Sequence, residues 1–177
     1  MQTRIAFCGP QRSGKTTAAN YLRDHYGAVV LSLASPIKEI AWNLFDAREK
    51  DRPLLIGIGE ALRTVDPLVF CKALIRQVEQ YPTEDLIVVD DVRSPLEWAF
   101  LAQHGFHHIF VQTDIEKRVQ RPDFDAGCLL DPTEQNVDLI PECPILYNNG
   151  SLEDFHGAVA CHLFGLKVLG VDLTEKV

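Results

Sequence analysis

Four residues near the start of the chain have the types and spacing of a phosphate-binding loop. Gly9, Gly14, Lys15 and Thr16 form the pattern G-x-x-x-x-G-K-T, with an apolar run before it and a helix-like run after it. Glycines let main-chain N–H groups point inward at anionic oxygens, and the following helix adds its positive end. Lys15 is predicted to reach the β- and γ-phosphates and the Thr16 hydroxyl to ligate Mg²⁺. An ordinary glycine turn is the alternative to this nucleoside triphosphate site.

The remaining positions of the loop are expected to surround the same triphosphate. Arg12 has a special place, because its backbone is held near the γ-phosphate and its side chain can compensate charge on the transferred group. Lys15 and Arg12 are therefore candidate catalytic residues. The residues assigned to ATP binding in this loop are Gly9, Gln11, Ser13, Gly14, Lys15, Thr16 and Thr17.

Two adjacent aspartates end another apolar run, LIVVDDV, at residues 86–92. In phosphate-loop proteins an acidic residue at this place holds Mg²⁺ directly or through water. Neighbouring strand residues face opposite ways, so one of the pair is expected to face the site. We favour Asp90 as the metal residue together with Thr16, and keep Asp91 as the alternative. Two solvated loop acids are a third interpretation.

Three arginines outside the loop are candidates for phosphate binding. Arg93 follows the aspartates at the edge of the sheet where ligands bind in open α/β folds, although a surface ion pair is an alternative. Arg118 and Arg121 are three apart on a short expected helix, next to an aperiodic stretch. We expect a lid over about 118–136 that excludes water, with both arginines as catalytic residues. A charged, solvated helix face is the alternative.

Strand and helix signals alternate along the chain, which is typical of a parallel sheet covered by helices on both faces. The predicted class is therefore α/β with three layers. Further strands are expected at 28–33, 107–113 and 144–149. Helices are expected at 35–45, over most of 52–81 with a fresh start at 66–67, from a capping box at 94–97 to Gly105, after Asp114, and from Ser151 to about Phe164.

Length and composition fit one domain over residues 1–177. A net charge of −8 without a long basic run argues against a nucleic-acid partner. The five cysteines are scattered and form no C-x-x-C, which indicates reduced thiols. No signal peptide is visible and no apolar run is long enough to cross a bilayer, so we expect a cytoplasmic protein with no membrane partner.

Several other features favour ordinary structural roles. A metal site at the paired histidines 107–108 is not expected, because they lie in a predicted strand. Trp42, Phe45 and Phe70 occupy helical positions and are expected in the core, with stacking on a base as the alternative for one of them. The chain has no N/T-K-x-D for guanine, and no D-x-x-G follows the third strand. A compact domain with a lid and a helical insertion indicates a small-molecule phosphotransferase.

The chain resembles the phage-type deoxynucleoside monophosphate kinases, a branch of the nucleoside monophosphate kinases related to adenylate and thymidylate kinases. The arginine inside the phosphate loop and the motif D-V-R-x-P-x-E are its most specific signs. Thr16 departs from the aspartate typical of that branch and restores a metal-binding hydroxyl. The similar segments cover most of 5–160 in the family's order: GPQRSGKTT, LASPIKEIAWNLF, RPLLIGIGEALRTVDPLVF, VVDDVRSPLEWAFL, DPTEQNVD and LYNNGSLEDF.

The resemblance carries implications beyond the spacing of residues. It implies a five-stranded parallel sheet of order 2-3-1-4-5 with an acceptor-binding helical region at about 35–80. It implies an acceptor monophosphate at Arg63, Asp66 and Arg93, approached also by Lys38. It further implies that Asn149, within the segment NNG, passes near the donor adenine.

Residues and resemblance together lead us to expect Mg²⁺-dependent transfer of the γ-phosphoryl group from ATP to a nucleoside or deoxynucleoside 5′-monophosphate. Such an acceptor is already an ionised nucleophile, so no general base is required. One alternative is a kinase of another small acceptor, such as dephospho-coenzyme A, with Asp91 as the base. Another is an ATP-binding sensor without catalysis. The sequence leaves open the base, the sugar and the oligomeric state, including a homodimer.

Overall fold

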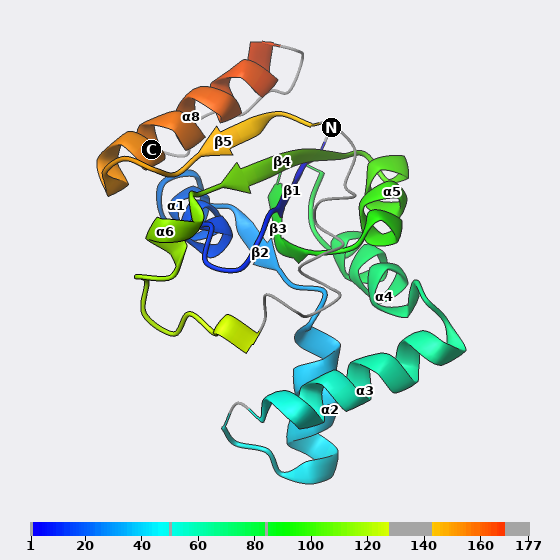
Figure 1. Ribbon diagram of the computed structural model, residues 1–177. Helices are drawn as coiled ribbons and strands as arrows, with labels where there is room; N and C mark the ends of the chain where they lie inside the picture. The colour runs from blue at the N-terminus through cyan, green and yellow to red at the C-terminus, as the bar shows by residue number, and fades with distance from the viewer. Residues whose placement is uncertain (1, 50, 84, 128–142, 169–177) are drawn as a thin grey trace.

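A five-stranded parallel sheet forms the centre of the computed structural model, which describes residues 2–49, 51–83, 85–127 and 143–168, with side chains to residue 165 (Figure 1). The strand order is β2-β3-β1-β4-β5, and every pairing is parallel. The expected fold class and strand order are therefore confirmed. The strands are β1 (Thr3–Cys8), β2 (Val29–Leu31), β3 (Leu86–Val92), β4 (Phe106–Gln112) and β5 (Ile145–Tyr147).

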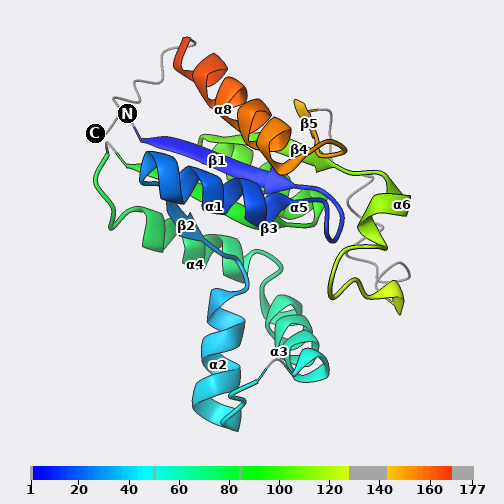
Figure 2. The same ribbon diagram turned by 90° about the vertical axis from the view of Figure 1, so that its left-hand side faces the viewer.

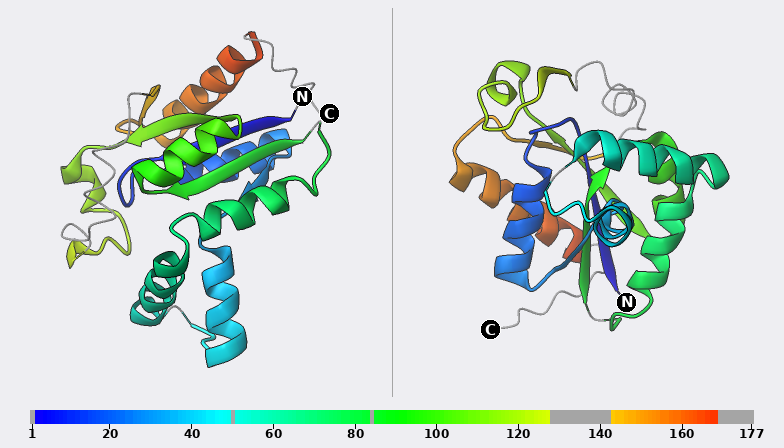
Figure 3. Two further views of the ribbon diagram at one scale, coloured as in Figure 1. Left: turned by 90° about the vertical axis from the view of Figure 1, so that its right-hand side faces the viewer. Right: turned by 90° about the horizontal axis from the view of Figure 1, so that it is seen from below.

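Helices cover both faces of the sheet and make it the middle of three layers (Figures 1 and 3). Helices α1 (Lys15–Tyr26) and α8 (Leu152–Val168) pack on one face, and α4 (Val69–Val78) and α5 (Pro95–Gln103) pack on the other. The apolar run of β3 alternates between the two layers, with Val88 toward α1 and α8 and Val89 toward α4 and α5. Double-sided burial explains why this strand is continuously apolar.

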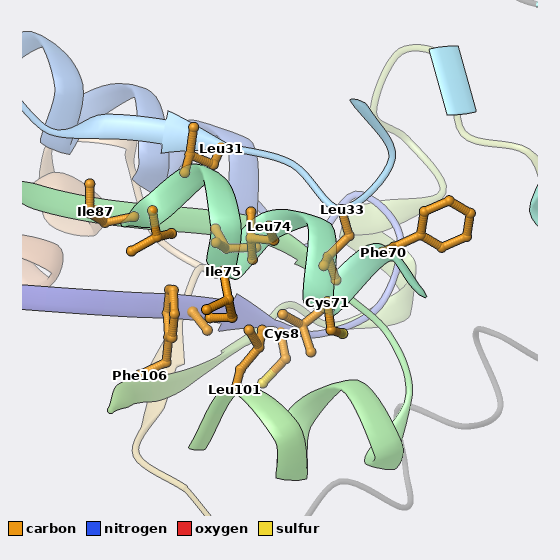
Figure 4. Packing of buried hydrophobic residues seen from close by; sticks show 14 of the residues in the cluster. Cys8, Leu31, Leu33, Phe70, Cys71, Leu74, Ile75, Ile87, Leu101 and Phe106 are labelled. Atoms are coloured by element: carbon orange, nitrogen blue, oxygen red, sulfur yellow. The ribbon is translucent and has the colours of Figure 1, made fainter. Parts of the chain in front are cut away.

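Figure 4 shows the core beneath α4 and α5 from close by. Cys71 and Leu74 of α4 lie over the sheet, Phe70 of α4 extends to one side of them, and Leu101 of α5 packs against the same cluster. Cys8, the last residue of β1, is fully buried in the same cluster. This packing holds the end of β1, and with it the start of the phosphate loop, against two helical elements.

Helices α2 (Ser35–Phe45) and α3 (Arg52–Val65) pair with each other and project from the sheet (Figure 2). Trp42 is 51% exposed and Phe45 is 56% exposed, whereas Phe70 is buried. The expectation of a core position is therefore wrong for Trp42 and Phe45 and correct for Phe70. The physical reason is that the outer part of α2 extends beyond the sheet, whereas α4 lies on it.

The local sequence signals for the ends of helices agree with the structure at the start of α5 but not at the end of the short helix that follows β4. The capping box that opens α5 is present: Ser94 Oγ accepts from Glu97 N at 3.2 Å, and Glu97 Oε2 accepts from Ser94 N at 3.1 Å. Helix α6 (Ile115–Arg118) is shorter than expected, so Arg121 lies beyond its end and the two arginines do not share one helix. No helix within the described ranges is long and apolar enough to cross a membrane.

Candidate active site

The phosphate loop joins β1 to α1 at the carboxyl edge of the sheet. Gly9 and Gly14 have φ angles of 135° and 113°, a region that glycine adopts readily. A Cβ at Gly14 would lie 2.2 Å from Asn148 Nδ2, and a Cβ at Gly9 would lie 2.3 Å from the Val111 carbonyl oxygen. Both glycines are therefore required for conformation and for space. The loop is drawn tightly against the ends of β4 and β5.

Hydrogen bonds from two other strand ends hold the middle of the loop. The Ser13 carbonyl accepts from Thr113 Oγ1 at 2.7 Å and from Asn148 Nδ2 at 2.8 Å, and all three residues are buried. Sequence reasoning missed Thr113 and Asn148 as supports of the loop, although a polar residue directly after an apolar strand is a recognisable signal. The Ser13 hydroxyl is buried next to Gly9 with no hydrogen-bond partner among the described residues. Such a buried polar atom fits a loop built to surround a polar ligand.

Lys15 is buried, and its ammonium group lies over the loop. Its Nζ donates to the carbonyl oxygens of Gly9 and Pro10, both at 2.7 Å. Of the other predicted ATP-binding residues, Gln11 and Thr17 are half-buried in the loop and in the first turn of α1. The loop therefore combines inward-turned backbone, a helix N-terminus and one ammonium group, which is a suitable environment for phosphate oxygens.

Thr16 and Asp90 meet across the sheet edge. Thr16 Oγ1 donates to Asp90 Oδ2 at 2.6 Å, although the residues are 74 positions apart. Burial, supported by the neighbouring charge of Asp91, raises the pKa of Asp90, while the Thr16 hydrogen bond opposes that rise. A hydroxyl beside a desolvated carboxylate supplies the hard oxygen ligands that Mg²⁺ prefers, with the nucleotide phosphates as further ligands. The residues present thus fit a magnesium ion.

Asp91 faces the other way and serves the start of α2. Its Oδ1 accepts from Leu33 N at 2.9 Å, and its Oδ2 accepts from Ser32 Oγ at 2.6 Å and from Ala34 N at 3.0 Å. The opposite orientations of two adjacent strand residues explain this division. The structure therefore brings Asp90, and not Asp91, to Thr16.

Arg12 of the phosphate loop contacts two residues in the chain that follows α6. Arg12 has a φ of 60° and forms an ion pair with Asp123 at 2.7 Å. Arg121 donates from Nη1 to the Arg12 carbonyl at 2.6 Å and from Nη2 to the Asn148 carbonyl at 3.2 Å. Burial lowers the pKa of Arg121. Arg121 thus braces the backbone of the phosphate loop.

Arg118, the last residue of α6, is only 8% exposed. The alternative of a solvated face for Arg118 and Arg121 is therefore wrong. Past Arg121, Asp125 forms an ion pair with Arg52 at the start of α3, a contact that sequence reasoning missed. The described part of the expected lid, residues 118–127, thereby touches both the phosphate loop and α3. The remainder, 128–136, lies outside the described residues.

A second group of charged residues lies next to the carboxyl end of β3. Arg63 Nη2 of α3 is 3.4 Å from Glu97 Oε1, and the Arg63 guanidinium lies over the Phe70 ring at 5.0 Å from its centroid. The Arg93 main-chain N donates to Glu97 Oε2 at 3.0 Å. The structure thus brings Arg63 and Arg93, two predicted acceptor residues, to the same buried carboxylate. This contact is made by the main chain of Arg93, so phosphate binding and a surface ion pair both stay open as roles of its side chain.

The other predicted binding residues have varied surroundings. Asp66 accepts from Lys72 Nζ at 2.7 Å and from Leu68 N at 3.0 Å, and the lysine lowers the pKa of Asp66. Asp66 therefore shapes the turn between α3 and α4. Lys38 is exposed on α2. The Asn149 side chain exchanges hydrogen bonds of 3.0 and 2.9 Å with Asp114, which fixes the chain after β5 to the turn before α6.

No protein-family model matches the chain. Its sequence is 30% identical over 171 residues to "Uncharacterized protein ORF76" of Ictalurid herpesvirus 1 (strain Auburn), in an alignment that covers 88% of this chain. The chain spans 65% of the length of that curated relative. The relative's name assigns no activity, so the likeness by itself transfers none.

Solved structures of similar shape include several kinases. TT1252 from Thermus thermophilus is 21% identical with a TM-score of 0.61, covering 93% of this chain and 98% of its own. Thymidylate kinase from Candida albicans is 14% identical with a TM-score of 0.59, covering 94% and 92%. Shikimate kinase from Acinetobacter baumannii in complex with shikimate is 14% identical with a TM-score of 0.58, covering 95% and 96%. At these identities the likeness concerns architecture, and the chain has the α/β fold of the P-loop kinases.

Proposed function

We propose that this protein transfers the γ-phosphoryl group of ATP to a nucleoside or deoxynucleoside 5′-monophosphate in a Mg²⁺-dependent reaction. One observation carries the proposal: the phosphate loop and two candidate acceptor arginines both reach the carboxyl end of β3. Asp90 contacts Thr16 of the phosphate loop, and three residues later the Arg93 main-chain N donates to Glu97, whose other carboxylate oxygen contacts Arg63. A donor and an acceptor phosphate bound at these groups would be neighbours.

Charge neutralisation and alignment are the main requirements for such a transfer, because two anions must approach each other. Lys15 would exchange the neutral carbonyls of Gly9 and Pro10 for phosphate oxygens, which are stronger, charge-assisted acceptors. Arg12 would exchange Asp123 for the transferred group. Arg121, through the Arg12 carbonyl, would hold the loop in place during that exchange.

Thr16 and Asp90 are the residues that would hold Mg²⁺ in this proposal. The ion, when bound, neutralises part of the charge of the β- and γ-phosphates. Asp90 must be ionised to contribute, and because burial raises its pKa, a cation bound beside it would favour the ionised form. Thr16 supplies a neutral oxygen from the first turn of α1.

An acceptor that attacks through a hydroxyl group, such as dephospho-coenzyme A, would need a base near the transferred group. Asp91 is the candidate base for such an acceptor, but its carboxylate already accepts three hydrogen bonds from the segment that opens α2. Both carboxylate oxygens are thus engaged with Ser32, Leu33 and Ala34, on the side of β3 away from Thr16 and the phosphate loop. This observation favours a monophosphate, which needs no base.

A coupled assay of ADP formation across the common nucleoside and deoxynucleoside monophosphates tests the proposal. Shikimate, gluconate and dephospho-coenzyme A serve as hydroxyl acceptors in the same panel. Turnover with one or more monophosphates and none with the hydroxyl acceptors is the expected result. Preferential turnover of a hydroxyl acceptor, or ATP binding without ADP formation in any mixture, would refute it.

Arginine-to-lysine variants test the acceptor assignment within the active enzyme. Arg63→Lys and Arg93→Lys keep the charge but lose the planar fork that contacts a phosphate through two parallel hydrogen bonds. Each should raise the KM of the monophosphate by about tenfold or more, equivalent to about 1.4 kcal/mol. The affinity for ATP, measured by calorimetry, should remain near the wild-type value. Weakened ATP binding with an unaltered acceptor KM would assign these arginines to the donor.

A further inference from the structure

We infer that Glu97 and Gly59 form a device that holds the Arg63 guanidinium in one position, with Glu97 as a positioning residue for the acceptor phosphate. The role of Arg63 toward the acceptor rests on the function proposed above. The holding device itself stands on contacts between described residues. It involves three separate elements: helix α3, the start of α4 and the capping box of α5.

Glu97 does more than its capping role requires. Its side chain is buried, and Oε2 alone accepts from both Arg93 N at 3.0 Å and Ser94 N at 3.1 Å. A glutamine at this position of a capping box performs that task equally well. The second oxygen, Oε1, faces Arg63 at 3.4 Å. The negative charge of Glu97 therefore serves the ion pair with Arg63, because the capping hydrogen bonds need only one carboxylate oxygen.

Gly59 provides the space in which the guanidinium lies. It precedes Arg63 by four residues, one helical turn, and it is the residue of α3 that is buried. A Cβ there would lie 3.1 Å from Arg63 Nη1 and 3.3 Å from Ile37 Cδ1 of α2. Glycine inside a helix is less favourable than alanine, but an alanine at this position would take space that the Arg63 guanidinium occupies.

Gly57 of the same helix gives the matched comparison. A Cβ at Gly57 would meet no atom within 4 Å, so an alanine there has open space. The two glycines thus share a helix and a backbone conformation but differ in their neighbours. Only Gly59 adjoins Arg63.

The Phe70 ring completes the enclosure on another side of the guanidinium, 5.0 Å from centroid to Arg63 Cζ. A guanidinium over an aromatic face, with one edge against a carboxylate, keeps its remaining N–H groups in a defined plane. Preorganisation of this kind reduces the entropy lost when a phosphate binds. Arg63 is 41% exposed at its side chain, so a ligand can reach it.

The first test uses the two glycines. Gly59→Ala should displace the guanidinium from its position beside Glu97 and raise the KM of the best monophosphate by about tenfold. Gly57→Ala should leave that KM within about twofold of wild type and raise the thermal midpoint by roughly 2–4 °C. The same increase in KM for both alanines would mean that helix flexibility, and not the space beside Arg63, controls acceptor binding, and would overturn the inference.

The second test uses the capping box. Glu97→Gln keeps the capping acceptor and removes the charge, so the acceptor KM should rise by about tenfold with little change in thermal midpoint or ATP affinity. Ser94→Ala removes the other half of the capping box without touching Arg63, so it should lower the midpoint and leave the acceptor KM near wild type. A Glu97→Gln enzyme with wild-type KM would count against the inference, as would equal changes in KM for both variants.

A measurement on Arg63 itself separates this inference from the proposed function. The order parameter of the Arg63 Nε–Hε vector, assigned by its absence in Arg63→Lys, should fall below about 0.6 in Glu97→Gln from a rigid value near 0.85. A rigid Arg63 in Glu97→Gln overturns the inference whatever the acceptor is. A mobile Arg63 with no effect of Arg63→Lys on any monophosphate upholds the holding device and refutes the acceptor assignment.

Discussion

Asp90 and Asp91 carry the same side chain at adjacent positions, yet they have separate tasks. Asp90 has one described hydrogen-bond partner, Thr16, and burial raises its pKa. Asp91 has three partners in the segment that opens α2. A carboxylate with a raised pKa and few partners is suited to a cation, whereas one with several N–H and O–H donors is already satisfied.

Removing the charge of Asp90 should therefore weaken the metal response specifically. In Asp90→Asn the Mg²⁺ concentration for half-maximal activity should rise by about tenfold or more, because a buried carboxylate contributes more to a cation than an amide does. In the wild-type enzyme the same concentration should rise as the pH falls toward the raised pKa, since protons then compete with Mg²⁺. Titration of activity with Mg²⁺ at several pH values checks both effects. An Asp90→Asn enzyme with an unchanged Mg²⁺ requirement would exclude this residue from the metal site.

Arg12 is paired with a highly exposed carboxylate, which makes the pair easy to exchange. The Asp123 side chain is 86% exposed, and ion pairs of this kind contribute little to stability. Arg12→Ala should lower kcat by about 10² or more with a smaller effect on ATP affinity, because arginines that stabilise phosphoryl transfer contribute about 10³–10⁵. Asp123→Ala is the control, since it removes the ion pair and keeps the cation. If the KM of ATP rises and kcat stays at the wild-type value, Arg12 is a binding residue only.

At the scale of elements, Asp91 connects the end of β3 to the start of α2. Asp91→Ala should lower the free energy of unfolding by about 1–3 kcal/mol, because the N–H groups of Leu33 and Ala34 lose their acceptor. Asp90→Ala is the matched control and should have a smaller effect, since burial already disfavours that charge. Urea denaturation of both variants checks the difference. If both variants lost the same free energy of unfolding, the different orientations of Asp90 and Asp91 would not explain their contributions to stability.

At the scale of the whole molecule, His108 links stability to pH. It is buried in β4, its ring lies 4.5 Å from that of Trp98 in α5, and its Nε2 has no partner among the described residues. Burial lowers the pKa of His108 to about 4, with His107 adding to the effect and the backbone at Phe106 opposing it. The folded protein therefore keeps this histidine neutral under conditions in which the unfolded chain binds a proton.

The free energy of unfolding should accordingly fall as the pH drops from about 6.5 to about 4, by up to about 3 kcal/mol from this group alone. The sign follows from a folded pKa below the unfolded one, so the stability is complete above pH 6.5 and lost on acidification. His108→Gln should remove this part of the slope in urea denaturation at a series of pH values. His107→Gln, on the exposed side of the strand, is the control and should keep most of this pH dependence, because burial is the largest cause of the shift. If the free energy of unfolding of His108→Gln still fell with pH as steeply as that of the wild type, His108 would not be the cause.

Local signals along the chain were sufficient for much of the architecture. The capping box at Ser94, the glycine pattern of the phosphate loop and the double-sided apolar run of β3 each act over a few residues. The strand order came from a family resemblance, and the parallel sheet confirmed it. Glycine conformation, capping and periodicity are short-range properties of the backbone, so a sequence determines them directly.

Tertiary packing decided which side chains meet. It turned Asp90 toward Thr16, left Trp42 exposed on a projecting helix, and brought Arg63 to the carboxylate of Glu97. The Thr16–Asp90 partners are 74 positions apart and the Arg63–Glu97 partners 34 apart, beyond the range of any local pattern. Their meeting depends on strand register, on how far α2 and α3 extend past the sheet, and on the space left by Gly59. These are properties of the packed molecule, because each arises from elements that contact one another only after the chain has folded.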